Sequence, residues 1–237
     1  MPTSNYDPIA DEYYDPRHIT SRNFDAATAA YFAKANSPCP PAGMVLELGA
    51  GRGSALKYCR LESSRILQTD LSRSMLSLFP REPSRLKLQC DALELPFRDS
   101  SFSAVFAFLY DPYNMSPLYH EVRRVLRAGG ALIGSLPHHL WGSTLRESLG
   151  YPSSKTRFKK FQSQDERLIE LDSFLMTDDQ IRAATYDAGL VVLSMEDLLL
   201  PKNITEVSAH IQLPAGILGL TPYTLPIVKL VIALRPK

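Results

Sequence analysis

The stretch MVLELGAGRGSAL, residues 44–56, constrains the fold of this chain more than any other stretch. A short apolar run ends at Gly49, Gly51 and Gly53, and a segment of helical character follows. Glycines at such a place allow positive φ angles and let a ligand approach the backbone closely. In an open α/β sheet this loop lies at the carboxyl edge of the strands, where ligands bind. We therefore expect a buried strand, a ligand-binding loop and a helix, in that order.

Apolar runs and helical segments alternate along the rest of the chain. The apolar runs predict further strands over residues 65–69, 86–89, 102–109, 131–136, 191–199 and 227–234. Helices are expected over residues 23–35 and 54–60, from a Ser72 cap to residue 79, from a Ser116 cap to Gly129–Gly130, and from the Thr177–Gln180 capping box to Gly189. Residues 138–176 show no clear periodicity. The alternation is typical of an α/β sheet with helices on both faces.

The charge balance and the composition exclude several classes of partner. The formal net charge of the 237 residues is +1, so no overall field draws the chain onto nucleic acid or anionic membrane. The most apolar stretch, residues 215–234, contains Pro222, Pro226 and Lys229, which argues against a membrane span. The 3 cysteines are widely spaced, and the acidic N-terminus lacks the apolar core of a signal peptide. These features predict a cytoplasmic protein without a metal site.

Carboxylates stand at or near the ends of the first three predicted strands. Glu47 precedes the glycine loop, Asp70 follows RILQT and Asp91 follows LKLQC. The loop spacing is G-x-G-x-G, with Ser54 where the dinucleotide fingerprint G-x-G-x-x-G has its third glycine. Glu47 would repel a pyrophosphate but suits an ammonium group, whereas Asp70 can accept two ribose hydroxyls and Asp91 an adenine amine. This set of groups disfavours an NAD-dependent oxidoreductase and matches S-adenosylmethionine.

At this point the chain resembles the class I S-adenosylmethionine-dependent methyltransferases, in the branch that acts mostly on small molecules. The matching pieces, in family order, are VLELGAGRG, TDLSRSML, CDALELPFRDSSFSAVFAF, EVRRVLRAGGALIGSLP and FLMTDDQIRAATYDAGL. The resemblance implies a Rossmann-like, doubly wound α/β fold with a seven-stranded, mostly parallel sheet and an antiparallel last strand. It further implies one domain over residues 1–237, with a lid at 1–40, a cofactor-binding core at 41–136 and substrate-cover segments at 137–176 and 200–226.

The resemblance also assigns cofactor contacts to positions of this chain. The glycine loop would line the methionine part, with Glu47 near its amino group, and Asp70 would hold the ribose. Asp91 would take the adenine amine, and the lid tyrosines Tyr6 and Tyr14 would close over the cofactor, where a ring face suits a sulfonium. The full set of expected cofactor residues is Tyr14, Glu47, Gly49, Ala50, Gly51, Gly53, Asp70, Leu71, Met75, Asp91, Ala92 and Leu109.

Asp111-Pro112-Tyr113 follows the fourth predicted strand and is the first candidate for contact with the methyl acceptor. It resembles the Asp/Asn-Pro-Pro-aromatic motif of DNA amino-methyltransferases with one proline missing. In that motif the acid accepts a hydrogen bond from an NH2 group and the aromatic ring stacks on the base. Asp-Pro is also a common turn opener, so Asp111 could instead cap the helix at Ser116. Both readings stay open from the sequence.

Other candidates lie near the rim of the expected pocket. His138 and His139 follow the fifth predicted strand, where a neutral imidazole could act as a general base. Basic residues at 155–160 are followed by acidic residues at 165–172, which indicates either a self-pairing surface or a site for an anionic substrate tail.

The predicted function is transfer of a methyl group from S-adenosylmethionine to an O or N atom of a small-molecule acceptor. One alternative is methylation of an exocyclic amine on a nucleobase or nucleotide by Asp111-Pro112-Tyr113. A second is a non-catalytic protein that binds S-adenosylmethionine as a regulatory or partner subunit. We expect a monomer or homodimer, a small-molecule partner, and no membrane or nucleic-acid partner.

Overall fold

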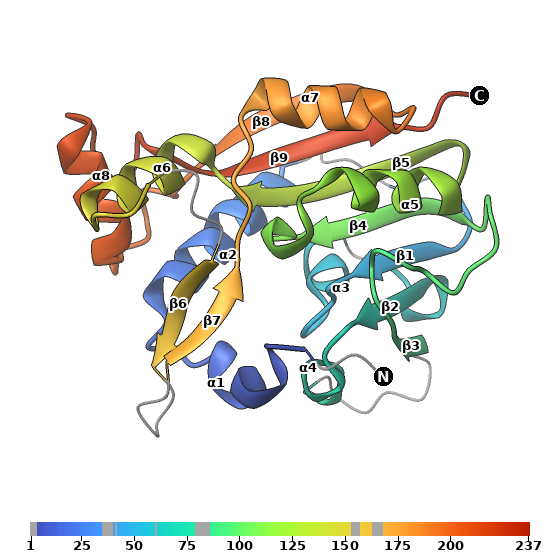
Figure 1. Cartoon of the computed structure of the whole chain (residues 1–237), viewed down its shortest axis with the longest axis horizontal. Coiled ribbons are helices and arrows are strands. Elements are labelled where there is room, and N and C mark those ends of the chain that lie inside the picture. Colours follow the sequence, from blue (N-terminus) through green and yellow to red (C-terminus); the bar gives the residue numbers. More distant parts are fainter. Residues whose placement is uncertain are drawn as a thin grey trace.

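A seven-stranded sheet forms the centre of the molecule (Figure 1). The computed structural model describes residues 4–34, 40, 42–59, 61–78, 86–152, 157–162 and 168–237. Along the sheet the strands run β3 (Leu86–Gln89), β2 (Ile66–Asp70), β1 (Val45–Leu48), β4 (Phe102–Phe108), β5 (Leu126–Pro137), β9 (Pro226–Leu234) and β8 (Val191–Leu199). Strands β1 to β5 pair in parallel, and β9 pairs antiparallel with both β5 and β8. The predicted fold class is therefore confirmed, and the strand order reverses between β1 and β4, the place where such sheets bind ligands.

Helices cover the sheet on both faces, and each face has its own apolar core. One core lies under α5 (Ser116–Val125) and α7 (Asp178–Asp187), which contribute Val122 and Ile181. The other lies under α2, α3, α6 and α8, with Phe24, Ala55 and Trp141 among its buried side chains. The remaining helix bounds are α1 (Ala10–Tyr13), α2 (Ile19–Phe32), α3 (Ser54–Cys59), α4 (Arg73–Ser77), α6 (His139–Ser148) and α8 (Ala209–Ile217), with short 3-10 turns η1 (Asp7–Ile9), η2 (Ser63–Arg65) and η3 (Asp111–Tyr113).

The local capping signals are confirmed at two helices and wrong at a third. The Ser72 hydroxyl accepts the Met75 amide at the start of α4, and Thr177 and Gln180 form the predicted capping box of α7. At α5, however, the cap position is Met115, and the helix ends at Val125 rather than at the two glycines. Leu126 already pairs with Phe102 in the sheet, and the register then shifts so that Ala131 faces Ala104. Residues 127–130, including Gly129–Gly130, therefore bulge within β5, because sheet pairing overrides the helical pattern.

The region without clear periodicity contains α6 and a separate antiparallel pair, β6 (Arg157–Gln162) and β7 (Leu168–Asp172). In Figure 1 this pair projects beside α1 and α2. Leu171 of β7 packs with Ile9, Tyr6 and Tyr13 of the N-terminal segment. Lys155, Asp165 and Glu166 of the predicted basic and acidic clusters lie outside the described residues. The same holds for the side chains of Arg157, Lys159, Lys160 and Glu170, so the structure does not test this prediction.

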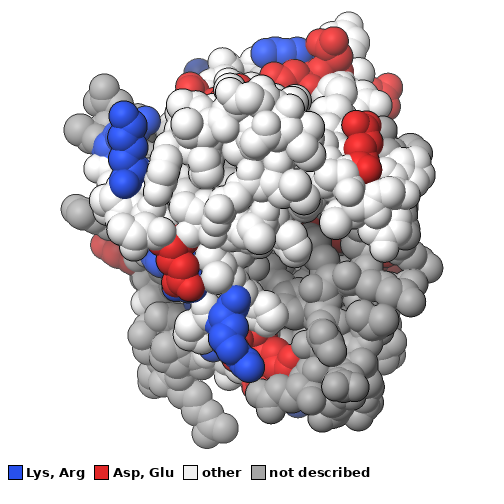
Figure 2. All heavy atoms as spheres, turned by 90° about the vertical axis from the view of Figure 1, so that its left-hand side faces the viewer, with Lys and Arg blue, Asp and Glu red and all other residues white. Residues whose placement is uncertain are grey.

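The segment at 200–226 packs on the outside of α2 and α6. Asn23 of α2 exchanges hydrogen bonds with the Glu206 carbonyl and the Ser208 amide, and the Trp141 ring of α6 donates to the His210 carbonyl. Figure 2 views this side, and its centre carries few charged side chains. Over the described ranges, no helix is long and apolar enough to cross a membrane. No group of metal-ligating side chains occurs among the residues searched there.

Candidate cofactor site and reaction cavity

The glycine loop has the backbone geometry that a ligand-binding turn requires. Gly49, Gly51 and Gly53 have φ angles of 56°, 46° and 86°, a region that disfavours any residue with a Cβ. A Cβ on Gly49 would meet nothing within 4 Å, so the chain leaves open space there. A Cβ on Gly51 would lie 2.0 Å from the Tyr14 hydroxyl oxygen. Gly51 therefore allows Tyr14 to close against the loop, where its hydroxyl accepts the Arg52 amide at 2.9 Å.

A cavity of about 330 Å³ opens at the carboxyl ends of β1, β2 and β4. The predicted residues on its wall are Tyr6, Tyr14, Gly49, Ala50, Gly51, Gly53, Asp70, Met75, Ala92, Leu109 and Tyr113. The wall also contains residues that the sequence did not predict as site residues, among them Tyr13, Ser21, Asp25, Arg52, Ser54, Lys57, Tyr58 and Phe108. Ser21, Asp25 and Thr28 recur at helical spacing on α2, a signal that could have revealed this polar face.

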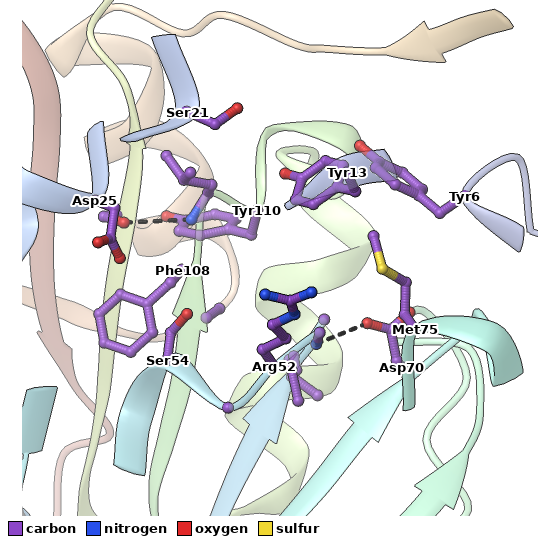
Figure 3. Close-up of a pocket in the computed structure, with 18 of the residues that line it drawn as sticks. Tyr6, Tyr13, Ser21, Asp25, Arg52, Ser54, Asp70, Met75, Phe108 and Tyr110 are labelled. Atoms are coloured by element: carbon purple, nitrogen blue, oxygen red, sulfur yellow. Dashed lines mark hydrogen bonds between the residues drawn. The ribbon is translucent and has the colours of Figure 1, made fainter. Parts of the chain in front are cut away.

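Asp70 stands on the cavity wall at the end of β2 (Figure 3). Its Oδ2 accepts the Gly51 amide at 3.0 Å, and its Oδ1 accepts the Ser72 amide at 2.9 Å. Burial raises the pKa of this carboxyl, although both amide hydrogen bonds act in the opposite direction. A half-buried carboxylate beside an open glycine loop fits the ribose of S-adenosylmethionine, because it still offers lone pairs to hydroxyl donors.

The raised pKa of Asp70 predicts a pH-dependent affinity for the cofactor. The ionised carboxylate accepts ribose hydroxyls, so binding should weaken as the pH falls through a folded-state pKa above the ordinary aspartate value. In the ligand-free protein, the effect of Asp70 on the free energy of unfolding has the opposite pH dependence. A folded-state pKa above the unfolded-state value contributes stability at low pH, and this contribution is lost as the pH rises through the folded-state pKa. We therefore expect the rise in Tm caused by S-adenosylhomocysteine to grow from about pH 4 to about pH 8. Thermal melts with and without S-adenosylhomocysteine across this pH range measure the ligand-induced rise in Tm. A rise that stays the same at every pH contradicts the prediction.

Glu47 has a different place from the one expected. Its side chain is 1% exposed and does not lie on the cavity wall. Its Oε1 accepts the Ala55 amide at 2.7 Å, and its Oε2 accepts the Gln68 side-chain amide at 2.8 Å. These bonds join β1 to α3 and β2. The predicted contact with the cofactor amino group is not supported by this geometry, because the carboxylate is used to satisfy buried donors.

The expected adenine side is formed by short loops after β2 and β3. Asp91 accepts the Leu93 amide at 2.9 Å and thereby presents Ala92 to the cavity wall. Leu71 is not on the wall, and its carbonyl accepts the Gln89 side chain at 3.0 Å. Met75 lies on the wall near Asp70 (Figure 3). The contact of Asp91 with an adenine amine stays a prediction.

The N-terminal segment closes the cavity with aromatic rings. The rings of Tyr6 and Tyr13 meet edge to face at 5.6 Å, and those of Tyr13 and Tyr14 at 5.0 Å. Asp7 fastens this segment to α4, since its Oδ1 accepts the Ser72 hydroxyl at 2.7 Å and the Ser74 amide at 3.1 Å. The predicted lid is thus anchored directly beside Asp70.

The chain turns sharply where β4 ends at the cavity. Leu109 has a φ of 52°, which is costly for a residue with a branched side chain and is typical of functional sites. Its amide donates to the Ser135 hydroxyl at 3.2 Å. The turn leads into η3 and brings Tyr110 and Tyr113 to the wall. Burial raises the pKa of both phenols, so they stay neutral at physiological pH. The Tyr110 hydroxyl donates to the Tyr119 hydroxyl at 3.2 Å, since Tyr119 itself donates to Asn114 Oδ1.

Asp111 neither lines the cavity nor caps α5. Its side chain is 5% exposed, and the N-terminus of α5 has no side-chain cap. Burial lowers the pKa of Arg146 on α6 to about 10, and the charge of Asp111 opposes that shift. The Asp111 carbonyl accepts the Phe174 amide at 2.9 Å. The Asp111 carbonyl therefore ties η3 to the segment after β7, and a carboxylate that lies off the cavity wall does not support the amine clamp.

His138 and His139 also lie away from the cavity wall. The Nδ1 of His138 accepts the Leu140 amide at 3.1 Å, and its Nε2 lies 3.2 Å from Asp197 Oδ1. Burial lowers its pKa, so the ring is a neutral cap at the start of α6. His139 is half-buried in the first turn of the same helix. The expected general base is not supported at either position, and His18 is the histidine on the wall.

Comparisons with known proteins agree with this fold. Residues 46–134 match the family model of the methyltransferase domain. A ubiquinone/menaquinone biosynthesis C-methyltransferase, UbiE, from Desulfotalea psychrophila is 34% identical over 109 residues, which cover 43% of this chain and 44% of that protein. The chain thus aligns with less than half the length of this curated relative.

Solved structures extend the likeness to the whole fold. A methyltransferase from Haloferax volcanii, solved in complex with the Trm112 methyltransferase activator, superposes with a TM-score of 0.71 at 16% identity over 100% of both chains. A protein from Listeria monocytogenes described as an S-adenosylmethionine-dependent methyltransferase gives 0.67 at 16% identity, covering 91% of this chain and 100% of the other. Residues 46–134 therefore match a methyltransferase domain, and the solved structures show that the chain shares the fold of such proteins.

Proposed function

We propose that this protein transfers a methyl group from S-adenosylmethionine to an O or N atom of a small-molecule acceptor. The observation that carries the proposal is the lid-covered cavity, which joins Asp70 and the glycine loop to a wall of aromatic side chains after β4. Its volume of about 330 Å³ is at the low end for small-molecule sites. Once the cofactor is bound, the remaining space suits a small acceptor or the end of a longer one.

The wall around the expected methyl group supports an acceptor with an uncharged reacting end. Tyr6, Tyr13, Tyr110, Pro112, Tyr113 and Leu118 contribute to this wall. The cationic residues on the cavity wall, including Arg22, Arg52 and Lys57, belong instead to α2, α3 and the glycine loop. A phosphate or carboxylate next to the reacting atom would therefore be poorly solvated by the residues after β4.

Transfer requires alignment and exclusion of water more than acid–base chemistry from the chain. S-adenosylmethionine supplies a methyl group that is already activated on a sulfonium. The neutral phenol of Tyr113 can orient the acceptor, and the faces of the lid tyrosines can stabilise nearby positive charge. The Asp7 contacts with α4 keep the lid closed over the reacting atoms. A proton released by an O or N acceptor would leave toward solvent at the cavity mouth.

The proposal is tested with a panel of small phenols, amines and hydroxylated compounds and methyl-labelled cofactor. We expect label transfer to neutral acceptors of modest size, with weaker transfer to analogues that carry a phosphate next to the reacting atom. Cofactor binding without transfer to any acceptor in the panel would favour the non-catalytic binding protein.

Size-exclusion chromatography with light scattering measures whether the protein is the expected monomer or homodimer.

The nucleobase alternative has lost its structural support. It depended on Asp111 as the acceptor of an amine hydrogen bond, and that carboxylate lies off the cavity wall. Tyr113 remains on the wall, but an aromatic ring alone is compatible with many flat acceptors.

A further inference from the structure

A polar group of side chains occupies the end of the cavity away from Asp70. Ser21 and Asp25 of α2 face Ser54, Lys57 and Tyr58 of α3 there, and all of them belong to the cavity wall. Figure 3 shows Asp25 and Ser54 on one side of the view and Asp70 with Met75 on the other. A ligand whose ribose lies at Asp70 would extend its other end toward this polar group.

Asp25 is bonded to two donors of α3. The Lys57 Nζ donates to Asp25 Oδ2 at 2.5 Å, and the Tyr58 hydroxyl donates to Asp25 Oδ1. The side chains of Lys57 and Asp25 are 56% and 42% exposed, so the pair is accessible from the cavity mouth. A carboxylate has about four lone-pair sites, and Asp25 can accept a further donor without losing Tyr58.

Other carboxylates are poorly placed for the same task. Glu47, which the family resemblance puts near the amino group, lies off the wall on the Ala55 amide and the Gln68 side chain. Asp15 is on the wall, but a single guanidinium, that of Arg17, holds both of its oxygens, at 3.0 and 2.7 Å, whereas Lys57 binds only one oxygen of Asp25. Among the described wall residues, Asp25 is therefore the acid best placed to meet an ammonium at this end.

We propose that Asp25 and Lys57 bind the amino-acid end of the cofactor, with Asp25 accepting from the ammonium and Lys57 pairing with the carboxylate. In the ligand-free protein the two side chains neutralise each other. An α-amino acid group carries the same two charges, so it can replace the internal ion pair with two intermolecular pairs and leave no charge uncompensated. The inference rests on cofactor binding and not on the identity of the methyl acceptor.

Tyr58 is a positioning residue for Asp25. Its ring stacks on Phe32 at 5.8 Å and meets Phe108 edge to face at 5.0 Å, so the phenol is fixed by packing. Burial and the charge of Asp25 raise its pKa, which keeps the hydroxyl protonated as a donor. Tyr58 thus holds one oxygen of Asp25 and leaves the other to exchange partners.

The experiment compares three adenosine ligands by isothermal titration calorimetry on the full chain. S-adenosylhomocysteine carries both charges, its decarboxylated analogue keeps only the ammonium, and 5′-methylthioadenosine lacks the whole amino-acid end. We expect Asp25→Asn to weaken the first two ligands about 10- to 100-fold and to leave 5′-methylthioadenosine within about 2-fold. Lys57→Gln should weaken S-adenosylhomocysteine about 10-fold and spare the decarboxylated analogue.

Asp99→Asn is the matched control, because Asp99 is also an exposed acid in an ion pair, with Arg124, and does not line the cavity. It should leave all three affinities unchanged. The inference is overturned if Asp25→Asn weakens 5′-methylthioadenosine as much as S-adenosylhomocysteine, since Asp25 would then only shape the wall. It is also overturned if S-adenosylhomocysteine binds the variant as tightly as the parent protein. Failure to find a methyl acceptor affects neither outcome.

Discussion

Replacing Asp70 with alanine is expected to lower the affinity for S-adenosylhomocysteine by about 100-fold or more. The carboxylate stands on the cavity wall at the end of β2 and offers lone pairs to two ribose hydroxyls. Each charge-assisted hydrogen bond lost costs about 1.5–3 kcal/mol. For the parent protein, ligand at about 100 times its Kd adds about 2.7 kcal/mol, or about 5–10 °C in Tm. In the variant this increment should almost disappear at the same ligand concentration.

The control for this experiment is the unliganded Tm of the variant. Asp70 accepts the Gly51 and Ser72 amides, so its loss also frees loop donors. A cooperative melt with normal far-UV circular dichroism shows that the fold has survived. If such a folded variant keeps the full ligand-induced increment, Asp70 does not hold the ribose.

Replacing Asp111 with alanine is expected to destabilise the fold by about 3 kcal/mol, which corresponds to about 6–12 °C in Tm. The reason is Arg146, whose side chain is buried and whose pKa is lowered by burial and raised by the Asp111 charge. Removing the acid leaves a buried cation without that compensation. At a temperature where the variant is folded, its turnover with a competent acceptor should stay within about 3-fold of the parent, a difference of less than 1 kcal/mol.

A double variant separates the two readings of Asp111. Asp111→Ala combined with Arg146→Met removes both charges, so it should be more stable than Asp111→Ala alone. Thermal melts of the parent protein, the two single variants and the double variant give the coupling free energy between Asp111 and Arg146. A selective loss of turnover in stable, folded Asp111→Asn would restore the amine clamp and contradict the structural role.

Much of the fold and of the cofactor site was predictable because the signals are local. The glycines after β1 are needed by the backbone of that loop itself, whatever the rest of the chain does. Asp70 and the Ala92 loop follow strands whose carboxyl ends meet at one edge of a parallel sheet. The helical spacing of apolar residues and the capping residues likewise predicted α4 and α7 close to their observed bounds. These features depend on residues a few positions apart.

The errors share a different physical origin. The end of α5 was misplaced because Leu126 pairs with Phe102 across the sheet, a contact that the helical pattern does not reveal. The polar face of α2 was missed because its importance comes from lying opposite α3 and the end of β4. Both depend on which elements become neighbours in space.

The sequence by itself determined the class of fold, the ligand-binding loop and the chemistry of its cofactor, since spacing along the chain encodes them. Only the tertiary structure decided which polar side chains reach the cavity. Glu47, Asp111 and His138 had suitable chemistry and suitable positions along the chain, yet each is buried. Glu47 accepts from the Gln68 side chain, His138 lies beside Asp197, and the Asp111 carbonyl accepts the Phe174 amide. A buried polar group must be compensated by a partner or lose several kcal/mol, and that partner exists only once the chain has folded.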